Sequence, residues 1–116
     1  MIKSHHFGFV FPIFRLDDFK KKYKNSIIDD IQKNYLFFNY SKKLNLWIEY
    51  IIPYSTTSTV YNFSLSKNAK KIHHYGFQVN NLELEKKKML KSNYVLINSF
   101  KINVPCFGGK IKTNFF

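Results

Sequence analysis

The four histidines of this chain fall into two short runs that resemble each other. HHFGFV occupies residues 5–10, and HHYGFQV occupies residues 73–79, 68 residues further along. Both runs are rich in the aromatic and β-branched residues typical of a strand, and acidic and then basic residues follow each, as in a short helix. Internal similarity of this kind indicates a duplicated structural unit. We therefore interpret the chain as two related halves, each opening with a histidine-bearing strand.

Successive side chains of a strand point to opposite faces, so the alternation sorts the residues of each run. His6, Gly8 and Val10 share one face in the first run, and His74 and Gly76 share one face in the second. The other face is aromatic in both runs, and we expect the helices to bury it. The second histidine of each pair then faces a surface to which glycine adds no bulk, so that a ligand could approach it.

A carboxylate with few obvious partners lies in the strand-like segment 44–52. Glu49 is the one acidic residue of this apolar segment, and an acid in such surroundings needs a partner. Two imidazoles and one carboxylate from different strands would suit Zn²⁺, Fe²⁺, Co²⁺, Ni²⁺ or Mn²⁺. The alternative is that the histidines are half-exposed strand residues and that Glu49 pairs with one of the many lysines. The internal repeat favours the metal site over this alternative.

The remaining pattern predicts the elements that would position these side chains. We expect the fold class α+β, with a βαβββ order in the first half: a strand at 4–11, a helix at 15–23, and strands at 27–31, 35–40 and 44–52. The second half repeats this order, with a strand at 71–79, a helix at 81–90, and strands at 94–100 and 111–116, and it stops one strand early. The Ser/Thr-rich stretch after Pro53 separates the two halves.

Length and composition limit the classes of protein. A chain of 116 residues with 45% hydrophobic residues can build one core, and we expect a single domain over residues 1–116. The single Cys106 and the absence of a long apolar run predict a cytoplasmic protein with no membrane partner. The net charge of +12 is compatible with an anionic ligand such as a phosphorylated coenzyme, but Lys is also abundant throughout, alongside Asn, Ile, Phe and Tyr, as in an AT-rich coding sequence.

The chain resembles the vicinal-oxygen-chelate superfamily of glyoxalase, bleomycin-resistance and dioxygenase proteins, and in particular its methylmalonyl-CoA epimerase-like and glyoxalase I-like branches. Four pieces carry the resemblance, and together they span nearly the whole chain: HHFG at 5–8, IEYIIP at 48–53, HHYGF at 73–77 and FGGK at 107–110. The resemblance implies two paired βαβββ modules, at about 1–54 and 70–116, that form a curved, mostly antiparallel sheet around a divalent metal ion. The last strand of the second module is missing.

The resemblance also implies the site residues. By position, the metal ligands are His6, Glu49 and His74, with Glu49 also catalytic, and the ion is Co, Zn, Ni, Mn or Fe. In such enzymes the metal binds adjacent oxygens of the substrate and stabilises the enolate formed when a base removes a proton next to a carbonyl. Epimerisation returns that proton to the other face. The family's fourth ligand, a Glu on the final strand, has no counterpart before Phe116.

Three functions are compatible with these residues. The leading expectation is a metal-dependent epimerase or glyoxalase-type lyase that acts on a small molecule such as an acyl-CoA, another thioester or an α-oxo compound. The alternative is a non-catalytic, bleomycin-resistance-like protein that binds a ligand in an aromatic-lined groove of a dimer. Nucleic-acid binding ranks last, because no helix-turn-helix, RNP-like or zinc-finger spacing occurs. The unpaired final edge at 114–116 would favour a homodimer.

Overall fold

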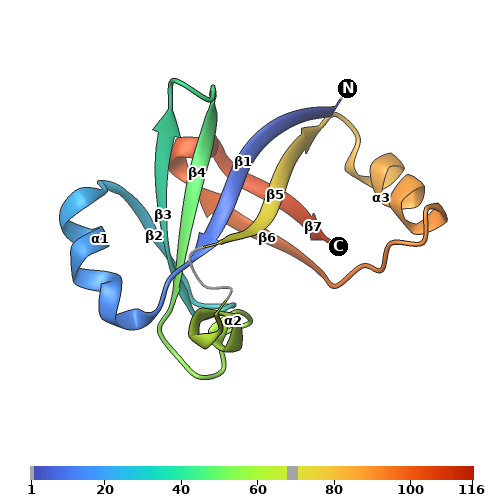
Figure 1. Cartoon of the computed structure of the whole chain (residues 1–116). Helices are drawn as coiled ribbons and strands as arrows, with labels where there is room; N and C mark the ends of the chain where they lie inside the picture. The colour runs from blue at the N-terminus through green and yellow to red at the C-terminus, as the bar shows by residue number, and fades with distance from the viewer. Residues whose placement is uncertain (1, 68–70) are drawn as a thin grey trace. The chain divides into compact units, whose positions relative to one another are not determined.

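The computed structural model describes residues 2–67 and 71–116 (Figure 1). The protein is α+β, as predicted, with a βαβββ order, then one short helix, and then βαββ. Its elements in chain order are β1 (Ile2–Val10), the 3₁₀ turn η1 (Ile13–Arg15), α1 (Leu16–Lys22), β2 (Asn25–Asp29), β3 (Asn34–Ser41), β4 (Leu46–Pro53), α2 (Tyr61–Leu65), β5 (Ile72–Val79), α3 (Leu82–Lys91), β6 (Asn98–Val104), the 3₁₀ turn η2 (Pro105–Phe107) and β7 (Gly109–Phe115).

Contacts between Cα atoms divide the chain into two compact units. The N-terminal unit is Ser4–Phe77, and the C-terminal unit comprises Gln78–Phe116 with the first residues of the chain. Most of β5 therefore belongs to the N-terminal unit, although the internal repeat places it at the start of the second module. The physical reason is that β5 is hydrogen-bonded to β1 in the larger sheet.

The N-terminal unit is built on a five-stranded sheet with the order β2-β3-β4-β1-β5. β2 and β4 both run antiparallel to β3, whereas β1 and β4 run parallel. The parallel pair is what a βαβββ unit requires when its first and last strands become neighbours. It brings the first histidine run directly beside the strand that carries Glu49.

One face of this sheet is covered by α1. The Phe19 ring of α1 lies 4.9 Å from the Phe11 ring, 5.0 Å from the Tyr50 ring and 5.7 Å from the Phe37 ring, measured between centroids. Phe37 and Ile52 beneath it are 2% and 0% exposed. Burying large aromatic side chains in this way supplies much of the stability of a small domain. Phe11, which directly follows β1 on its aromatic side, is thus packed under a helix, as the alternation predicts. The same expectation was wrong for β5, because Tyr75 and Phe77 on its aromatic face are each 59% exposed.

The other face of the central strands also buries apolar side chains. Its buried apolar members come from β1, β3 and β4: Val10, Leu36, Phe38 and Ile51. Strands that are buried on both faces read as continuous apolar runs, which explains why β3 and β4 show little polar alternation. His6 and Glu49 lie on this second face.

A buried carboxylate closes the turn between β2 and β3. Asp29, 6% exposed, accepts hydrogen bonds from the backbone N–H groups of Ile31 and Gln32 at 3.1 and 3.2 Å, and from Nε2 of Gln32 at 3.0 Å. Lys33 then takes a left-handed conformation with φ 63°. Asp29 therefore has a local role in holding the turn.

The C-terminal unit consists of α3 and the β6–β7 hairpin. Asn81 caps α3, and its side-chain oxygen accepts a hydrogen bond from the N–H of Leu84 at 3.0 Å. The hairpin turns at Gly108 and Gly109, which have φ values of 98° and 110°. These glycines fix the register so that Val104 pairs with Gly109.

The prediction of a strand at 94–100 was wrong in its boundaries. The residues at its start are exposed, with Val95 at 74% and Ile97 at 68%, and the N–H of Tyr94 still bonds to the carbonyl of Met89 at the end of α3. The strand begins only at Asn98, because the glycine turn sets which residues can pair with β7. β-branched and aromatic residues favour a strand but do not determine which strand it pairs with.

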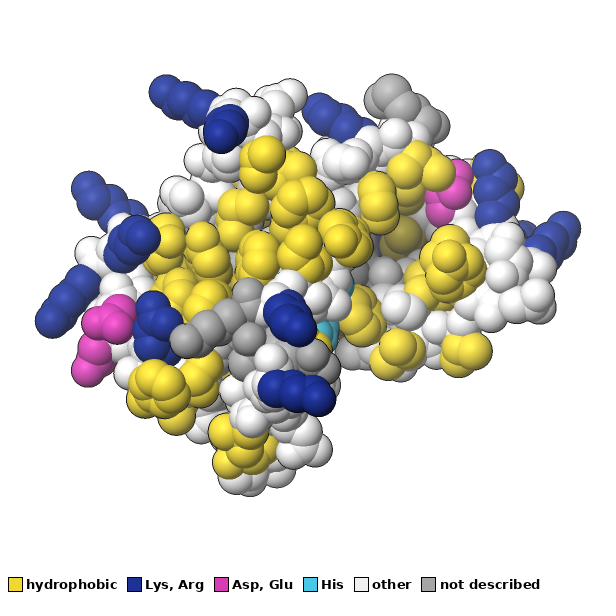
Figure 2. Space-filling model, in the orientation of Figure 1, with side chains coloured by type: hydrophobic (Ala, Val, Ile, Leu, Met, Phe, Trp, Pro, Cys, Tyr) yellow, Lys and Arg dark blue, Asp and Glu magenta, His cyan; other side chains and the backbone are white. Residues whose placement is uncertain are grey.

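The surface carries many lysines. On the face drawn in Figure 2, Lys and Arg side chains project into solvent at many places. Some cover aromatic rings instead of standing apart: Nζ of Lys20 lies 5.2 Å from the centre of the Tyr35 ring, and Nζ of Lys22 lies 5.4 Å from that of Tyr23. Among the residues that the structure describes, no helix has both the length and the apolar character needed to cross a bilayer.

Candidate metal centre

Three neighbouring strands of the N-terminal unit each present one predicted ligand. β1 and β4 are paired in parallel, with Gly8 opposite Glu49, so that Glu49 and His6 lie on the same face of the sheet. β5 flanks β1 on its other side and contributes His74. The strand alternation that was read from the sequence therefore places all three side chains on one face.

The donor atoms of these three residues converge. Nε2 of His6 lies 3.0 Å from Nε2 of His74, and Oε1 of Glu49 lies 3.1 Å from Nε2 of His74 and 3.8 Å from Nε2 of His6. The centre of a triangle with these sides is about 2 Å from each corner. Bonds from zinc to imidazole nitrogen and carboxylate oxygen are roughly 2.0–2.2 Å long. The spacing of the donors therefore fits one metal ion.

No second group of this kind occurs in the described part of the chain. The only set of three histidine, cysteine, aspartate or glutamate side chains close enough to share an ion there is His6, Glu49 and His74. Cys106, the single cysteine of the chain, lies half-buried in η2 of the C-terminal unit. The residues that the sequence predicted as ligands are thus the ones that the fold brings together.

The glycine of each histidine run makes room for the imidazole of the other run. A Cβ added at Gly8 would overlap the His74 ring, and a Cβ added at Gly76 would overlap the His6 ring. Such reciprocal contacts require β1 and β5 to run in opposite directions and to cross near Phe7 and Tyr75, whose ring centroids lie 5.3 Å apart. We predicted that the glycines would open the surface to a ligand. Instead, the partner strand's imidazole occupies that space.

Burial decides the protonation of His6. Its side chain is 18% exposed, and this burial lowers its pKa from 6.5 to about 4, against the opposing effect of the Glu49 carboxylate and with smaller contributions from His74 and His5. His6 is therefore neutral near pH 7 and has a nitrogen lone pair to offer a metal ion.

Glu49 is held in its charged form by the neighbouring histidines. Burial of the side chain, which is 13% exposed, raises its pKa, but the hydrogen bond from His74 and the positive charge that His6, His74 and His73 can carry outweigh burial and leave the pKa below its ordinary value. The carboxylate is thus ionised at neutral pH, as a metal ligand must be.

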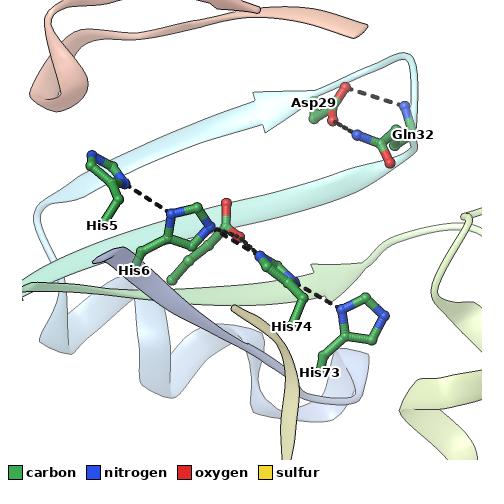
Figure 3. A network of polar contacts seen from close by, with 7 residues as sticks. His5, His6, Asp29, Gln32, His73 and His74 are labelled. Atoms are coloured by element: carbon green, nitrogen blue, oxygen red, sulfur yellow. Dashed lines mark hydrogen bonds and ion pairs between the residues drawn. The ribbon is translucent and has the colours of Figure 1, made fainter. Parts of the chain in front are cut away.

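The outer histidines extend the cluster into a line of four imidazoles, which Figure 3 shows. Nδ1 of His5 lies 2.9 Å from Nδ1 of His6, and Nδ1 of His73 lies 2.9 Å from Nδ1 of His74. Sequence reasoning missed this role, because alternation assigns His5 and His73 to the opposite face. The signal that could have found it is the doubling of the histidine in both runs.

The pKa of His6 predicts that the metal-free protein loses stability in acid. Because the unfolded chain binds a proton on this ring near pH 6.5 and the folded chain only near pH 4, the stabilisation is complete above about pH 6.5 and is lost as the pH falls to about 4. The loss should be about 3 kcal/mol. Glu49, with a lowered pKa, acts with the same sign below its ordinary value of 4.5.

Urea unfolding, followed by the fluorescence of Trp47 in β4, measures this dependence, since the chain has a single tryptophan. The His6→Gln variant serves as the control and should show a shallower decline in the free energy of unfolding between pH 6.5 and pH 4.5. Parallel curves for the two proteins would show that His6 is not the responsible group.

Comparison with known proteins adds no identification. No family model matches the chain, and no curated protein matches it either. The geometry of the centre itself is therefore what indicates a function.

Proposed function

We propose that this protein binds one divalent metal ion through Nε2 of His6, Oε1 of Glu49 and Nε2 of His74, and that it acts as a metal-dependent isomerase or lyase. The reaction would move a proton next to a carbonyl group of a small molecule, as in methylmalonyl-CoA epimerase-like proteins. The observation that carries the proposal is the convergence of the three donor atoms, from three adjacent strands, on a point about 2 Å from each.

The donor set supports a catalytic site over a structural one. Structural zinc sites are closed by four protein ligands, whereas catalytic sites keep a position open for water or substrate. Two histidines and a carboxylate are a recurrent three-ligand set with open positions. A bound divalent cation would supply Lewis-acid stabilisation of the negative charge that develops on a carbonyl oxygen during proton removal.

The protein side chains have distinct roles in this proposal. His6 and His74 would each present one ring nitrogen to the cation, and each ring lies where the glycine of the partner strand has no side chain. Glu49 holds the cation through Oε1 and has a second carboxylate oxygen, so it is the ligand that can also accept or return a proton. Its lowered pKa keeps it unprotonated at the start of such a step.

The net charge of the chain supports the proposed substrate class. A net charge of +12 raises the local concentration of anions, and a phosphate-bearing thioester such as an acyl-CoA combines that charge with an acidic carbon next to a carbonyl. An α-oxo compound offers the same acidic carbon without the phosphates. Both belong to the small-molecule substrates that the proposal predicts.

The test begins with metal binding. Protein purified without a metal-affinity tag and stripped with chelator is titrated with Co²⁺ and with Zn²⁺ by calorimetry, and we expect close to one ion per chain. The loaded protein is then incubated in D₂O with a panel of acyl-CoA and α-oxo compounds, and proton exchange next to the carbonyl is followed by NMR, with stripped protein as the control.

Each result has a definite meaning. Stoichiometric binding with metal-dependent exchange supports the proposal. Failure to bind either ion would overturn it. Binding without exchange of any compound would exclude the isomerase or lyase part and favour a non-catalytic ligand-binding protein.

A further inference from the structure

The two histidines outside the proposed ligand set make matching contacts. The rings of His5 and His6 have centroids 5.1 Å apart at an angle of 89°, and those of His73 and His74 have centroids 5.2 Å apart at 87°. In both pairs the two Nδ1 nitrogens lie 2.9 Å apart. This distance is that of a hydrogen bond, so one nitrogen of each pair carries the hydrogen and the other accepts it.

The nitrogen that binds the metal determines which of the two Nδ1 atoms carries the hydrogen. A neutral imidazole carries one N–H, and a ring that binds a cation through Nε2 must carry its hydrogen on Nδ1. The Nδ1–H of His6 then points at Nδ1 of His5, and that of His74 points at Nδ1 of His73. Each outer histidine can accept this bond only when its own hydrogen is on Nε2.

We propose that His5 and His73 are positioning residues of the metal centre: by accepting the Nδ1–H bonds of His6 and His74, they fix these two rings in the tautomer whose Nε2 lone pairs face the cation. The inference deepens the proposed function and rests on it. Ligand histidines in metal sites usually donate their second N–H to a carboxylate, a backbone carbonyl or water. Here, neutral imidazoles take that place on both sides.

Packing holds at least one of the outer rings in its place. The His73 ring lies edge-on against Phe63 of α2, with centroids 4.8 Å apart and an angle of 83° between the rings. His5 and His73 are both partly buried. A ring fixed by an aromatic neighbour can orient another ring, because its own rotation is restricted.

The choice of a neutral acceptor has an electrostatic consequence. A carboxylate in the same place would add a negative charge and draw the hydrogen away from Nδ1, which makes the ligand more basic and the cation less electrophilic. An imidazole fixes the tautomer without that added charge. The centre then keeps Glu49 as its one anionic member among the described residues that form the cluster.

The experiment compares alanine and asparagine at the two outer positions, with the metal-binding wild type as reference. Oδ1 of asparagine stands at nearly the same distance from the backbone as Nδ1 of histidine and accepts a hydrogen bond in its place. We expect His5→Ala and His73→Ala to weaken Co²⁺ and Zn²⁺ binding by roughly 10- to 100-fold in chelator competition. His5→Asn and His73→Asn should restore the affinity to within a few-fold of wild type.

The tautomers themselves are read by long-range ¹H–¹⁵N NMR of the imidazoles in the zinc-loaded wild type. We expect the hydrogen of His6 and of His74 on Nδ1, and that of His5 and His73 on Nε2. This spectrum decides the proposal even if an alanine variant does not fold, which Trp47 fluorescence would reveal. Ligation through Nδ1 in either His6 or His74 would overturn it.

The outcomes separate this inference from the proposed function. If the wild type binds no metal, the proposed function fails and this inference fails with it. If the wild type binds metal and both alanine variants bind it equally well, the proposed function stands and the positioning role is overturned. Weakened binding that asparagine does not restore would also overturn it, since that pattern indicates a packing role for the ring.

Discussion

Alanine in place of His6 or of His74 is expected to weaken Co²⁺ and Zn²⁺ binding by more than about 100-fold, beyond the effect typical of residues in the outer sphere. Each variant loses one of three donor atoms that lie within 4.8 Å of one another. The two remaining donors cannot enclose the ion, and metal content after dialysis should fall from near one per chain to near zero. Elemental analysis of protein prepared without a metal-affinity tag measures the change.

The third ligand, Glu49, can be tested in the same way, with a matched control at a second glutamate. Glu49→Gln removes the charge of the centre with little change of shape, and we expect it to weaken binding as strongly as loss of a histidine. Glu83→Gln makes the same chemical change at an exposed position in the first turn of α3 and should leave the affinity unchanged. Equal metal content in the wild type and in the His6→Ala and His74→Ala variants would place the ion elsewhere or exclude it.

Gly8→Ala and Gly76→Ala are each expected to destabilise the protein by about 3 kcal/mol and to abolish stoichiometric metal binding. The added methyl group would overlap the His74 ring in the first variant and the His6 ring in the second. The neighbouring atoms belong to a ring enclosed between strands, so the clash cannot be relieved by a flexible chain end. Urea unfolding of the metal-free variants measures the free energy of unfolding.

Double-mutant cycles make this test specific to the crosswise contact. Gly8→Ala should cost far less in the His74→Ala background, where the ring is gone, than in the His6→Ala background, where it stays. Gly76→Ala should show the reverse preference. We expect a coupling energy of about 1 to 3 kcal/mol in the two crosswise pairs. Costs that do not depend on the background would show that the glycines act through the backbone alone.

Much of the fold could be predicted from the periodicity of apolar residues and from the residues that begin or end strands and helices. The aromatic alternation of β1 and β5 was visible in the sequence, and β1 ends before Pro12 as predicted. The acidic start and basic end of α1 located that helix to within a residue or so. The prediction that β4 begins at residue 44 was wrong, because Asn45 turns with φ 54° and the strand begins at Leu46.

The site was predictable in its members and not in its arrangement. His6, Glu49 and His74 were singled out by residue type and by the repeat, and the fold brings them together on one face. The sequence does not show which strands become neighbours. The parallel pairing of β1 with β4 and the opposite directions of β1 and β5 are therefore known only from the structure. The roles of His5 and Gly8 depend on those pairings and could not be read beforehand.

The crosswise fit of imidazole and glycine also constrains how this protein can diverge. Gly8 is compatible with His74 and Gly76 with His6, so a bulkier residue at either glycine is tolerated only after the histidine across the strand pair has become smaller. Once one histidine is lost, the opposite glycine could be replaced by a larger residue. The centre would then be difficult to regain, because the glycine and the histidine would both have to be restored. In descendants of this sequence the four positions should therefore be inherited as two linked pairs, retained together or lost together.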